Sequence, residues 1–370
     1  MSSEGPLRIL HIMRAPMGGL FRHVVDLARE QARRGHEVGI VADSTTGSAS
    51  AGQILADLAP TLKLGITRAP MSRQIGPRDL TAFLHVRDRA RETRADVLHG
   101  HGAKGGAYAR LIGGPAINAY TPHGGSLFYA PDSASGRVYH SIERWLRSRT
   151  DLILFESEFA RTIYRKCVGE PPFSRIVHNG ISAIELAPIT PNPDAVDFVF
   201  IGELRWRKGI DVLLEALAAL AAEGWRGKAL FYGAGPDRAA AEARAVELGL
   251  GAQVTFPGES KPRAAFASGK LLVIPSRQES LPYIVLEAAA ARMPMITTSV
   301  GGIPEIFGPD ADALVPAGDK DALRAAMKRQ IKGGCPELVE RLQRRIAQSF
   351  TVESMTDAVL AAYAEARHAR

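Results

Sequence analysis

Short apolar and β-branched runs alternate with helical stretches along this chain, and the alternation constrains the fold more than any other feature. LRILHIM (7–13) has the pattern of a strand, LFRHVVDLAREQARRG (20–35) carries apolar residues at helical spacing, and EVGIVA (37–42) is the next strand. Later runs that end in turns are ADVLHGHG, AINAYTPHG, TDLILFESE and SRIVHNG. Such a series predicts a parallel sheet with helices on both faces.

The alternation begins again after residues 186–197, LAPITPNPDAVD, whose prolines and polar residues are typical of a linker. The strands of the second series end at FVFIGEL, KALFYGAG, AQVTFPGE, GKLLVIPSRQES and MPMITTSVGG. At 370 residues the chain is longer than one core usually supports. We therefore predict an α/β protein with two doubly wound, Rossmann-like domains facing across a cleft, with ligands outside the carboxyl ends of the strands. A closing helix is expected from about Thr351.

Positive charge is concentrated in the first half of the chain. Residues 1–180 hold 24 Lys and Arg against 16 Asp and Glu, whereas residues 181–370 hold 22 against 23. This excess fits either a solvated arginine surface or attraction to anionic lipid or to a pyrophosphate-bearing substrate. Nucleic acid is not favoured, because the basic residues lack interleaved aromatics and a helix-turn-helix pattern.

Other features of the sequence bear on compartment. The longest apolar runs are shorter than the ~20 residues that a membrane-spanning helix needs. The start, MSSEGPLRILHIM, lacks the pattern of a secretion signal. Two distant cysteines, Cys167 and Cys335, form no metal-ligand spacing. We expect a cytoplasmic protein with reduced cysteines.

Two glutamates flank a predicted helix start in PSRQESLPYIVLEAAAARMP (275–294). The helix is expected from about Pro282, which places Glu279 in the loop before it and Glu287 roughly 7.5 Å along its axis. The free amides of the helix N-terminus favour a phosphate. A nucleotide diphosphate sugar has hydroxyls at both ends and a pyrophosphate between them, and so fits this arrangement. The alternative is a capping acid and one chance inner glutamate.

The two glutamates enclose seven residues, and this arrangement, with PSR before it and VGGIPEI (300–306) after it, resembles the signature of retaining glycosyltransferase family 4. Further segments resemble those of the family in the expected order: MGGLFRHVVDLAREQARRGHEV (17–38), TPHGG (121–125), VHNGI (177–181), GELRWRKGIDVLLEAL (202–217) and YGAGP (232–236). The resemblance covers nearly the whole chain.

The resemblance implies the two-domain GT-B fold. Residues 1–182, with a closing helix at about 352–370, form the acceptor-binding domain, and residues 183–351 form the nucleotide-sugar-binding domain. It also implies hexose transfer that retains the anomeric configuration, with no metal and no cofactor beyond a UDP- or GDP-linked sugar as co-substrate.

By the resemblance, the donor is held chiefly by the segment that carries the two glutamates. Glu279 is expected to bind hydroxyls of the transferred sugar and Glu287 to bind the ribose. Ser280, Leu281 and Pro282 are expected to contact the phosphate and the sugar.

Lys208 is expected to neutralise the diphosphate leaving group, because without a metal fixed cations must offset the charge that builds as the sugar–phosphate bond breaks. The family often has arginine directly after the glycine of this loop, where this sequence has Glu203. Arg205 and Arg207 lie in the same loop. We assign Arg205 as the second phosphate cation and leave Arg207 as the alternative.

Two glycine pairs are assigned to the donor. Gly18 and Gly19 follow the first strand, where the absence of side chains lets backbone amides approach a phosphate or an acceptor closely. Gly233 and Gly235 are expected to line the nucleotide pocket through their backbone.

Histidines end two strands of the first series. His123 in TPHGG matches the cleft histidine of the family and is expected to touch the transferred sugar or its reaction centre. His101 and Lys104 follow another strand and are assigned to the acceptor, with a polar turn as the alternative. His99 and His101 could indicate a metal, but no carboxylate or cysteine completes a local set, so we predict none.

These assignments predict a retaining glycosyltransferase that moves a hexose onto a saccharide or a polyprenyl-diphosphate-linked saccharide in polysaccharide or glycoconjugate assembly. A nucleotide-sugar 2-epimerase and a non-catalytic nucleotide-sugar-binding subunit remain alternatives.

A lipid-linked acceptor would place the protein at an anionic membrane surface. Apolar Leu80, Phe83 and Leu84 would then form an interfacial helix, with a core-facing helix as the alternative. The surrounding arginines are Arg73, Arg78, Arg87, Arg89, Arg91 and Arg94.

Overall fold

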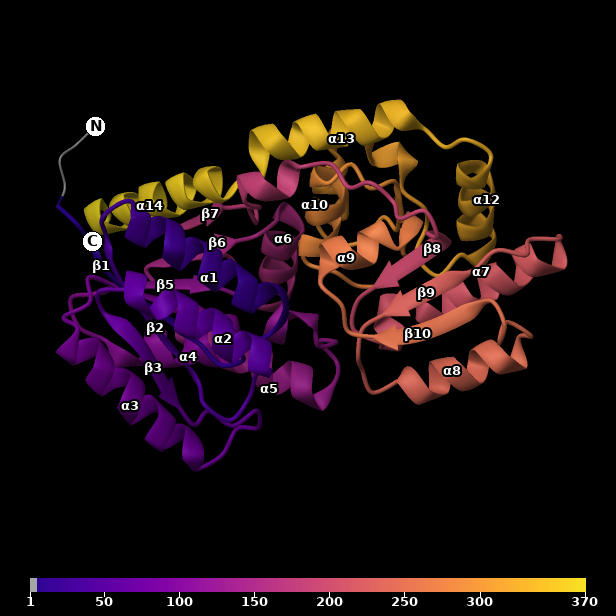
Figure 1. Cartoon of the computed structure of the whole chain (residues 1–370). Helices are drawn as coiled ribbons and strands as arrows, with labels where there is room; N and C mark the ends of the chain where they lie inside the picture. Colours follow the sequence, from indigo (N-terminus) through magenta and orange to yellow (C-terminus); the bar gives the residue numbers. More distant parts are fainter. Residues whose placement is uncertain (1–4) are drawn as a thin grey trace. The chain divides into compact units, whose positions relative to one another are not determined.

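The computed structural model describes residues 5–370, which divide into two units (Figure 1). The N-terminal unit contains the residues up to Gly180 together with Val352–Arg370, and the C-terminal unit is Ile181–Thr351. No helix within residues 5–370 is both long enough and apolar enough to cross a bilayer.

The N-terminal unit is built on a seven-stranded sheet in the order β3-β2-β1-β4-β5-β6-β7. Every neighbouring pair is parallel. The central strands are buried along nearly their whole length, because helices cover both faces of a parallel sheet. The strands are β1 (Arg8–Met13), β2 (Glu37–Asp43), β3 (Gly65–Ala69), β4 (Val97–His101), β5 (Ile117–Thr121), β6 (Leu152–Phe155) and β7 (Ser174–Ile176).

The last helix of the chain belongs to this first unit. Figure 1 shows α14, in yellow, beside α1, in indigo. Its residues Met355, Val359 and Tyr363 are each at most 2% exposed and join a core that contains Leu27 of α1. The helices of the unit are α1 (Gly18–Arg33), α2 (Ala49–Leu58), α3 (Arg78–Glu92), α4 (Gly102–Ile112), α5 (Ala134–Arg147), α6 (Glu158–Cys167) and α14 (Val352–His368), with 3-10 turns η1 (Ala59–Thr61) and η2 (Gly125–Phe128).

The C-terminal unit has a five-stranded parallel sheet in the order β10-β9-β8-β11-β12. Its strands are β8 (Val196–Ile201), β9 (Ala229–Tyr232), β10 (Val254–Gly258), β11 (Gly269–Ile274) and β12 (Met295–Thr297). Its helices are α7 (Ile210–Ala222), α8 (Arg238–Glu247), α9 (Pro262–Ala267), α10 (Tyr283–Ala290), α11 (Ile303–Phe307), α12 (Lys320–Ile331) and α13 (Pro336–Ser349), with 3-10 turns η3 (Ala183–Leu186), η4 (Trp206–Lys208) and η5 (Gly308–Ala313).

Both sheets are therefore doubly wound, which confirms the predicted fold class. In each sheet the first strand of the unit is the third from one edge, and the chain later returns to its other side. The strand order thus reverses between β1 and β4 and between β8 and β11. Ligands of open parallel sheets bind outside the carboxyl ends of the strands at such points.

Candidate active site

A lysine and a glutamate meet where the strand order of the C-terminal unit reverses. Lys208 ends η4 in the loop after β8, and Glu279 lies in the loop after β11. The Lys208 Nζ donates to Glu279 Oε1 at 2.6 Å, and the Ser276 hydroxyl donates to the same oxygen at 2.7 Å. The two side chains are 18% and 8% exposed. Since an ammonium has three donors and a carboxylate has two oxygens, the pair can bind a phosphate and a hydroxyl while staying in contact.

Two glycines explain how this pair is held. Gly209 has φ +72°, and a Cβ there would lie 1.9 Å from the carbonyl oxygen of Pro275. Gly301 has φ +61°, and a Cβ there would lie 2.1 Å from the carbonyl oxygen of Glu279. Both loops thus pack backbone against backbone on residues 275–279, a contact that only glycine permits.

Helix α10 begins at Tyr283, one residue after the predicted start. Pro282 is its N-cap in an extended conformation, and the first turn carries no acidic residue. A first turn without an acidic residue favours an anion at this end of the helix. Leu281 is 3% exposed and belongs to the apolar core, so only its backbone can reach a ligand. Glu287 lies on α10 and is 8% exposed.

Glu203 binds both arginines of its loop. Arg205 Nε donates to Glu203 Oε1 at 3.0 Å, and Arg207 Nη2 donates to Oε2 at 2.8 Å. Burial raises the pKa of Glu203, but the hydrogen bonds and charges of Arg207 and Arg205 outweigh burial and lower it. Glu203, where the family often has arginine, thus neutralises one of the two positive charges. A diphosphate would compete with Glu203 for either arginine.

Gly233 and Gly235 lie where packing alone requires glycine. A Cβ at Gly233 would lie 1.9 Å from the carbonyl oxygen of Gly202, and one at Gly235 would lie 2.2 Å from that of Leu204. The amide of Gly233 donates to the carbonyl oxygen of Gly258 at 2.8 Å. A nucleotide contact through these glycines stays a prediction.

In the N-terminal unit the Gly18–Gly19 turn starts helix α1. Gly18 has φ +65° and both glycines are exposed. The N-cap Met17 makes no capping hydrogen bond through its side chain, and the first turn carries no acidic residue. The first amides of this 16-residue helix are therefore accessible to an anion.

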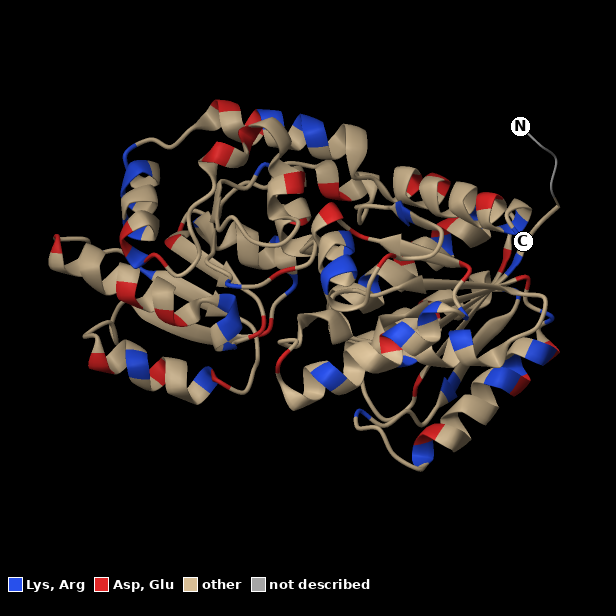
Figure 2. Cartoon of the chain, turned by 180° about the vertical axis from the view of Figure 1, so that it is seen from behind, with Lys and Arg blue, Asp and Glu red and all other residues tan. Residues whose placement is uncertain are grey.

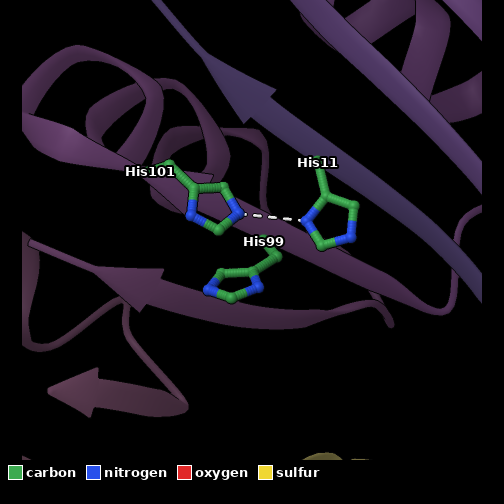
Figure 3. A group of neighbouring side chains, drawn as sticks. All are labelled: His11, His99 and His101. Carbon is green, nitrogen blue, oxygen red and sulfur yellow. Dashed lines mark hydrogen bonds between the residues drawn. The ribbon is translucent and has the colours of Figure 1, made fainter. Parts of the chain in front are cut away.

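A chain of hydrogen-bonded histidines, buried except for the half-buried His123, crosses the centre of the N-terminal sheet. Figure 3 shows His11 of β1 facing His99 and His101 of β4. His11 Nε2 bonds to Gln31 Oε1 at 2.8 Å, and His11 Nδ1 bonds to His101 Nε2 at 3.0 Å. His101 Nδ1 bonds to His123 Nε2 at 3.1 Å. These hydrogen bonds therefore connect the buried side-chain amide of Gln31 to His123, which the family resemblance places at the reaction centre.

Two further histidines pack against this chain through their own hydrogen bonds. His99 bonds to Thr121 Oγ1 at 2.8 Å and to the Tyr363 hydroxyl at 2.7 Å, and its ring centroid lies 4.0 Å from that of His101. His23 of α1 bonds to Asn179 Oδ1 at 3.0 Å. Its other nitrogen, Nε2, is buried without a hydrogen-bond partner in the described part of the chain.

Burial keeps all five histidines neutral near pH 7. Burial lowers the pKa of His11 and of His23 to about 4. The pKa values of His99, His101 and His123 are lowered well below the usual value, first by burial and then by neighbouring imidazoles. Each ring therefore carries one proton on one of its two nitrogens.

The hydrogen bonds fix where those protons are. Gln31 Oε1 can only accept, so His11 Nε2 donates to it and His11 Nδ1 accepts from His101 Nε2. His101 Nδ1 in turn accepts from His123 Nε2. His123 Nδ1 is left as a hydrogen-bond acceptor, which can orient a hydroxyl.

The backbone of His123 is strained. Its φ is +53°, in the left-handed region that non-glycine residues avoid, and Gly124 and Gly125 follow with positive φ as well. Such conformations cost about 1–3 kcal/mol and persist where the surroundings over-determine them, often at functional sites. Here the hydrogen bond to His101 and the two glycines keep the ring at the strand end.

His101, Lys104 and His123 come together around one cavity of about 300 Å³ at the carboxyl ends of β1, β4 and β5. Lys104 forms an ion pair with Asp79, which also accepts from the Tyr108 hydroxyl at 2.5 Å. The lining residues are Arg14, Ala15, Leu20, Arg73, His101, Gly102, Ala103, Lys104, Pro122, His123, Gly125, Ser126, Tyr129 and Tyr139. A larger cavity of about 720 Å³ lies near Leu7, Asp96 and Ala116, which precede β1, β4 and β5, away from the strand ends that carry the polar side chains.

More histidines could contribute to a metal site than the local sequence indicated. The local segment HGHG offers two ligands, but the fold adds His11 from β1, His23 from α1 and His123. Two triads, His11–His99–His101 and His23–His101–His123, have ring nitrogens within 4.8 Å of one another and could hold a metal ion. Most of these nitrogens are engaged in the hydrogen bonds described above. Independence of metal therefore stays a prediction.

Sequence reasoning did not single out His11, His23 or Asn179. A signal existed for His11, because a histidine inside an apolar strand must find a buried partner. For His23 and Asn179 the known family segments included the residues, but nothing in the sequence showed that they meet across 156 positions.

Models of two protein families match the two units. The model described as Glycosyltransferase Family 4 matches residues 17–183, and the model described as Glycosyl transferases group 1 matches residues 195–333. These two ranges contain every residue that was assigned to a site from the sequence.

Individual relatives and solved structures are similar to this chain over nearly its whole length. A D-inositol 3-phosphate glycosyltransferase of Actinosynnema mirum is 26% identical over 95% of this chain and 93% of its own length. The solved sucrose-phosphate synthase of Thermosynechococcus elongatus has TM-score 0.81 and 18% identity, covering 98% of this chain and 100% of that chain. The Anabaena protein HepE, solved with UDP-glucose, has TM-score 0.80 and 17% identity, covering 97% and 100%. At these identities the two structures show the fold alone.

Proposed function

The chain belongs to the family 4 glycosyltransferases of the GT-B fold, and we propose that it transfers a hexose from a nucleotide diphosphate sugar with retention of the anomeric configuration. The acceptor is a saccharide or a polyprenyl-diphosphate-linked saccharide in polysaccharide or glycoconjugate assembly. The observation that carries this proposal is the contact between Lys208 and Glu279, in the loop that leads into α10.

The proposed chemistry assigns charge and position to protein groups. Lys208 offsets the charge that develops on the departing diphosphate, with Arg205 as the second cation once the phosphate competes with Glu203. Glu279 accepts hydrogen bonds from the sugar hydroxyls and Glu287 from the ribose. The acceptor hydroxyl attacks from the face that the phosphate leaves, and the departing phosphate oxygen accepts its proton. Gly18, Gly19, Gly233, Gly235 and residues Ser280–Pro282 contribute backbone contacts to the donor.

Two other functions use the same architecture. A nucleotide-sugar 2-epimerase would change the donor without an acceptor and needs an acid and a base at the sugar. A non-catalytic subunit would bind the donor and turn nothing over, and the retained Lys208–Glu279 pair and His123 argue against it. Neither has a specific observation in its favour.

A donor screen tests the proposal. UDP- and GDP-sugars are added to the protein, starting with UDP-glucose because the Anabaena neighbour was solved with it. A ligand at ~100 times its Kd should stabilise the protein by about 2.7 kcal/mol, which a thermal shift detects. The donor that stabilises is then incubated with and without acceptor. Sugar transfer supports the proposal, free epimer indicates the first alternative, and binding without turnover indicates the second.

Removal of metal ions is expected to leave transfer unchanged. Lys208 and Arg205 supply the positive charge that a metal would otherwise bring to the diphosphate. The protein is treated exhaustively with EDTA, its metal content is measured, and its rate is compared with that of the untreated protein. A loss that only a divalent ion restores would contradict this prediction and direct attention to the histidine triads.

Binding to an anionic membrane surface is the expected consequence of a lipid-linked acceptor. Figure 2 shows the arginines of α3 in blue, at the lower right. This helix packs on the core through Ala82, Val86 and Ala90, with Phe83 partly buried against them, while Leu80 is 65% exposed. The apolar contribution to membrane binding thus rests mainly on Leu80, and most of the attraction must be electrostatic, about 1 kcal/mol per arginine.

Liposome flotation measures this attraction. The protein should rise with anionic vesicles at low salt and stay behind with neutral vesicles, and salt should weaken the binding. Equal behaviour with both kinds of vesicle, or no flotation, would remove the membrane from the proposal.

A further inference from the structure

We propose that His23, His101 and His123 form a binding site for a transition-metal ion such as Zn²⁺, and that the bound ion inhibits transfer. One ring nitrogen of each residue lies within 4.8 Å of those of the other two. The triad contains no carboxylate and no thiol, so its ligands are three imidazoles. The site goes beyond the proposed function, which needs no metal, and only the inhibitory effect rests on that function.

A lone pair on His23 is the observation that points to a ligand. His23 lies on α1, is 2% exposed, and bonds through Nδ1 to Asn179 Oδ1 at 3.0 Å. Because an amide oxygen can only accept, Nδ1 carries the proton and Nε2 carries the lone pair. Within residues 5–370 no group donates a hydrogen bond to this Nε2. Such a buried, unsatisfied polar atom is uncommon in native structures, and a bound ion is one of its recognised explanations.

The other two histidines already face each other at nearly the spacing that zinc requires. His101 Nδ1 and His123 Nε2 are 3.1 Å apart. Two nitrogens bound to one tetrahedral zinc at 2.0–2.1 Å lie about 3.3–3.4 Å apart. The ion takes the place of the proton that bridges them, and His123 carries its proton on Nδ1 instead. All three rings stay neutral in this exchange, and each then presents a lone pair to the ion.

The hydrogen bonds behind the triad match those of metal-binding histidines, which donate their other ring N–H to an acceptor. His23 donates to Asn179. His101 Nε2 donates to His11 Nδ1, the contact drawn in Figure 3, and His11 donates to Gln31 Oε1 at 2.8 Å. Both rings are therefore held in the tautomer that leaves a lone pair for the ion.

The cavity of about 300 Å³ gives an ion access to the triad and selects the kind of ion. His101 and His123 both line it. No aspartate or glutamate is among its described lining residues, and Arg14 and Arg73 are. These charges oppose a hard cation such as Mg²⁺, which prefers carboxylate and water ligands, whereas imidazole nitrogens suit Zn²⁺, Cu²⁺ and Ni²⁺.

The ion changes what His123 presents to the cavity. Without the ion, His123 Nδ1 is a hydrogen-bond acceptor that can orient a hydroxyl. With the ion on Nε2, Nδ1 carries the proton and can only donate. A site that needs the acceptor form therefore loses activity when the ion binds. Because the ion inhibits the reaction and does not serve it, transfer by the metal-free protein is unaffected.

The first test measures binding of Zn²⁺ alone to chelator-treated protein by calorimetry. The background is Cys167→Ser with Cys335→Ser, so that thiols do not contribute. His23→Gln and His123→Gln should each weaken binding at least ~10-fold, since loss of an outer-shell partner alone costs that much at metal sites. His85→Gln, at an exposed position on α3, should leave binding unchanged. Absence of binding, or equal binding by all variants, overturns the proposal.

The second test identifies the ligands by spectroscopy. Co²⁺ replaces Zn²⁺, and its visible absorption should show the bands of a four-coordinate ion with nitrogen ligands. Circular dichroism checks that each variant is folded, and the half-buried His123 provides the variant to rely on if His23→Gln does not fold. Loss of the bands in a folded His123→Gln supports the site. The same bands in that variant, or binding of Mg²⁺ as tight as that of Zn²⁺, overturn it.

The third test compares the rate of transfer with and without saturating Zn²⁺. The wild type should lose at least ~10-fold, because a group at the reaction centre is left in the wrong protonation state. EDTA should restore the rate, and His23→Gln should show a ratio near one at the same Zn²⁺ concentration. Binding of Zn²⁺ without inhibition overturns the inhibitory role.

The binding measurements separate this proposal from the proposed function, because they need neither donor nor acceptor. If Zn²⁺ does not bind and transfer proceeds, the metal site is wrong and the transferase stands. If Zn²⁺ binds the triad and the metal-free protein transfers no sugar, the proposed function is wrong and the metal site stands.

Discussion

Glu279→Gln is expected to lower turnover at least ~100-fold while the fold survives. Glutamine keeps the shape of the side chain and an oxygen that accepts from Ser276, but it removes the charge that binds Lys208 at 2.6 Å. Preorganised charges of this kind typically contribute ~100-fold or more to rate. Turnover is measured at saturating donor, and the folded state is checked by circular dichroism and thermal unfolding.

Lys208→Ala is expected to show a loss of similar size, because it removes the cation proposed to stabilise the leaving group. Since the two side chains act as one unit, the double variant should lose about as much as the worse single variant, well short of the product of the two. Glu247→Gln is the control: its carboxylate pairs with Arg244 on α8 and is 64% exposed. Wild-type turnover in Glu279→Gln or Lys208→Ala, or an equal loss in Glu247→Gln, would contradict the site.

The free energy of unfolding is expected to fall steeply as the pH drops below 6.5. An unfolded histidine has a pKa near 6.5, whereas burial holds the pKa of His11 and His23 in the folded protein at about 4. Between these values the unfolded chain binds more protons than the folded one, so stability decreases as pH decreases. Each buried histidine contributes up to about 1.4 kcal/mol per pH unit.

The pKa values of His99, His101 and His123 are lowered as well, so these histidines add to the same loss of stability in the N-terminal unit. Urea unfolding between pH 7 and pH 5 measures the slope before most carboxyl groups titrate. His11→Gln should reduce the slope by up to about 1.4 kcal/mol per pH unit. His85→Gln, at an exposed position on α3, should leave it unchanged. A slope near zero in the wild type, or an unchanged slope in His11→Gln, would show that the histidines are not held neutral.

The sequence predicted the architecture because parallel sheets leave a clear pattern. Strands covered by helices on both faces are apolar throughout, and the helices between them show helical spacing. The order of the strands could not be predicted in the same way. Nothing within β1 specifies β4 as a neighbour rather than β3, since pairing depends on how the crossover helices pack.

Individual residues of the candidate site could be predicted where they belong to a recognisable motif. Contacts between residues that are far apart in the sequence could not be predicted. Glu279 and Lys208 were assigned separately from the family motifs. Their direct contact across 71 positions was not expected, because the two were assigned to different groups of the donor. Glu203 was noted as a departure, but only the structure shows that it binds both Arg205 and Arg207.

The histidine chain shows the same limit more strongly. His11 and His99 are partners in the register of β1 and β4, so their rings meet only because these two strands are adjacent. From the sequence, His99 and His101 were considered as a local pair, and the absence of a metal site was predicted from that pair alone. The hydrogen bonds to Gln31, His123 and Tyr363 depend on elements far apart in the chain.

The stereochemistry of the product tests the central claim most directly. The donor identified by the thermal-shift screen, an α-linked nucleotide sugar, is incubated with acceptor, and the anomeric proton of the newly formed bond is followed by NMR from the first turnovers. The account predicts that the transferred hexose appears with the α configuration. A β-linked product would contradict front-face transfer at Glu279 and Lys208, and free sugar or epimer in place of a glycoside would contradict the transferase itself.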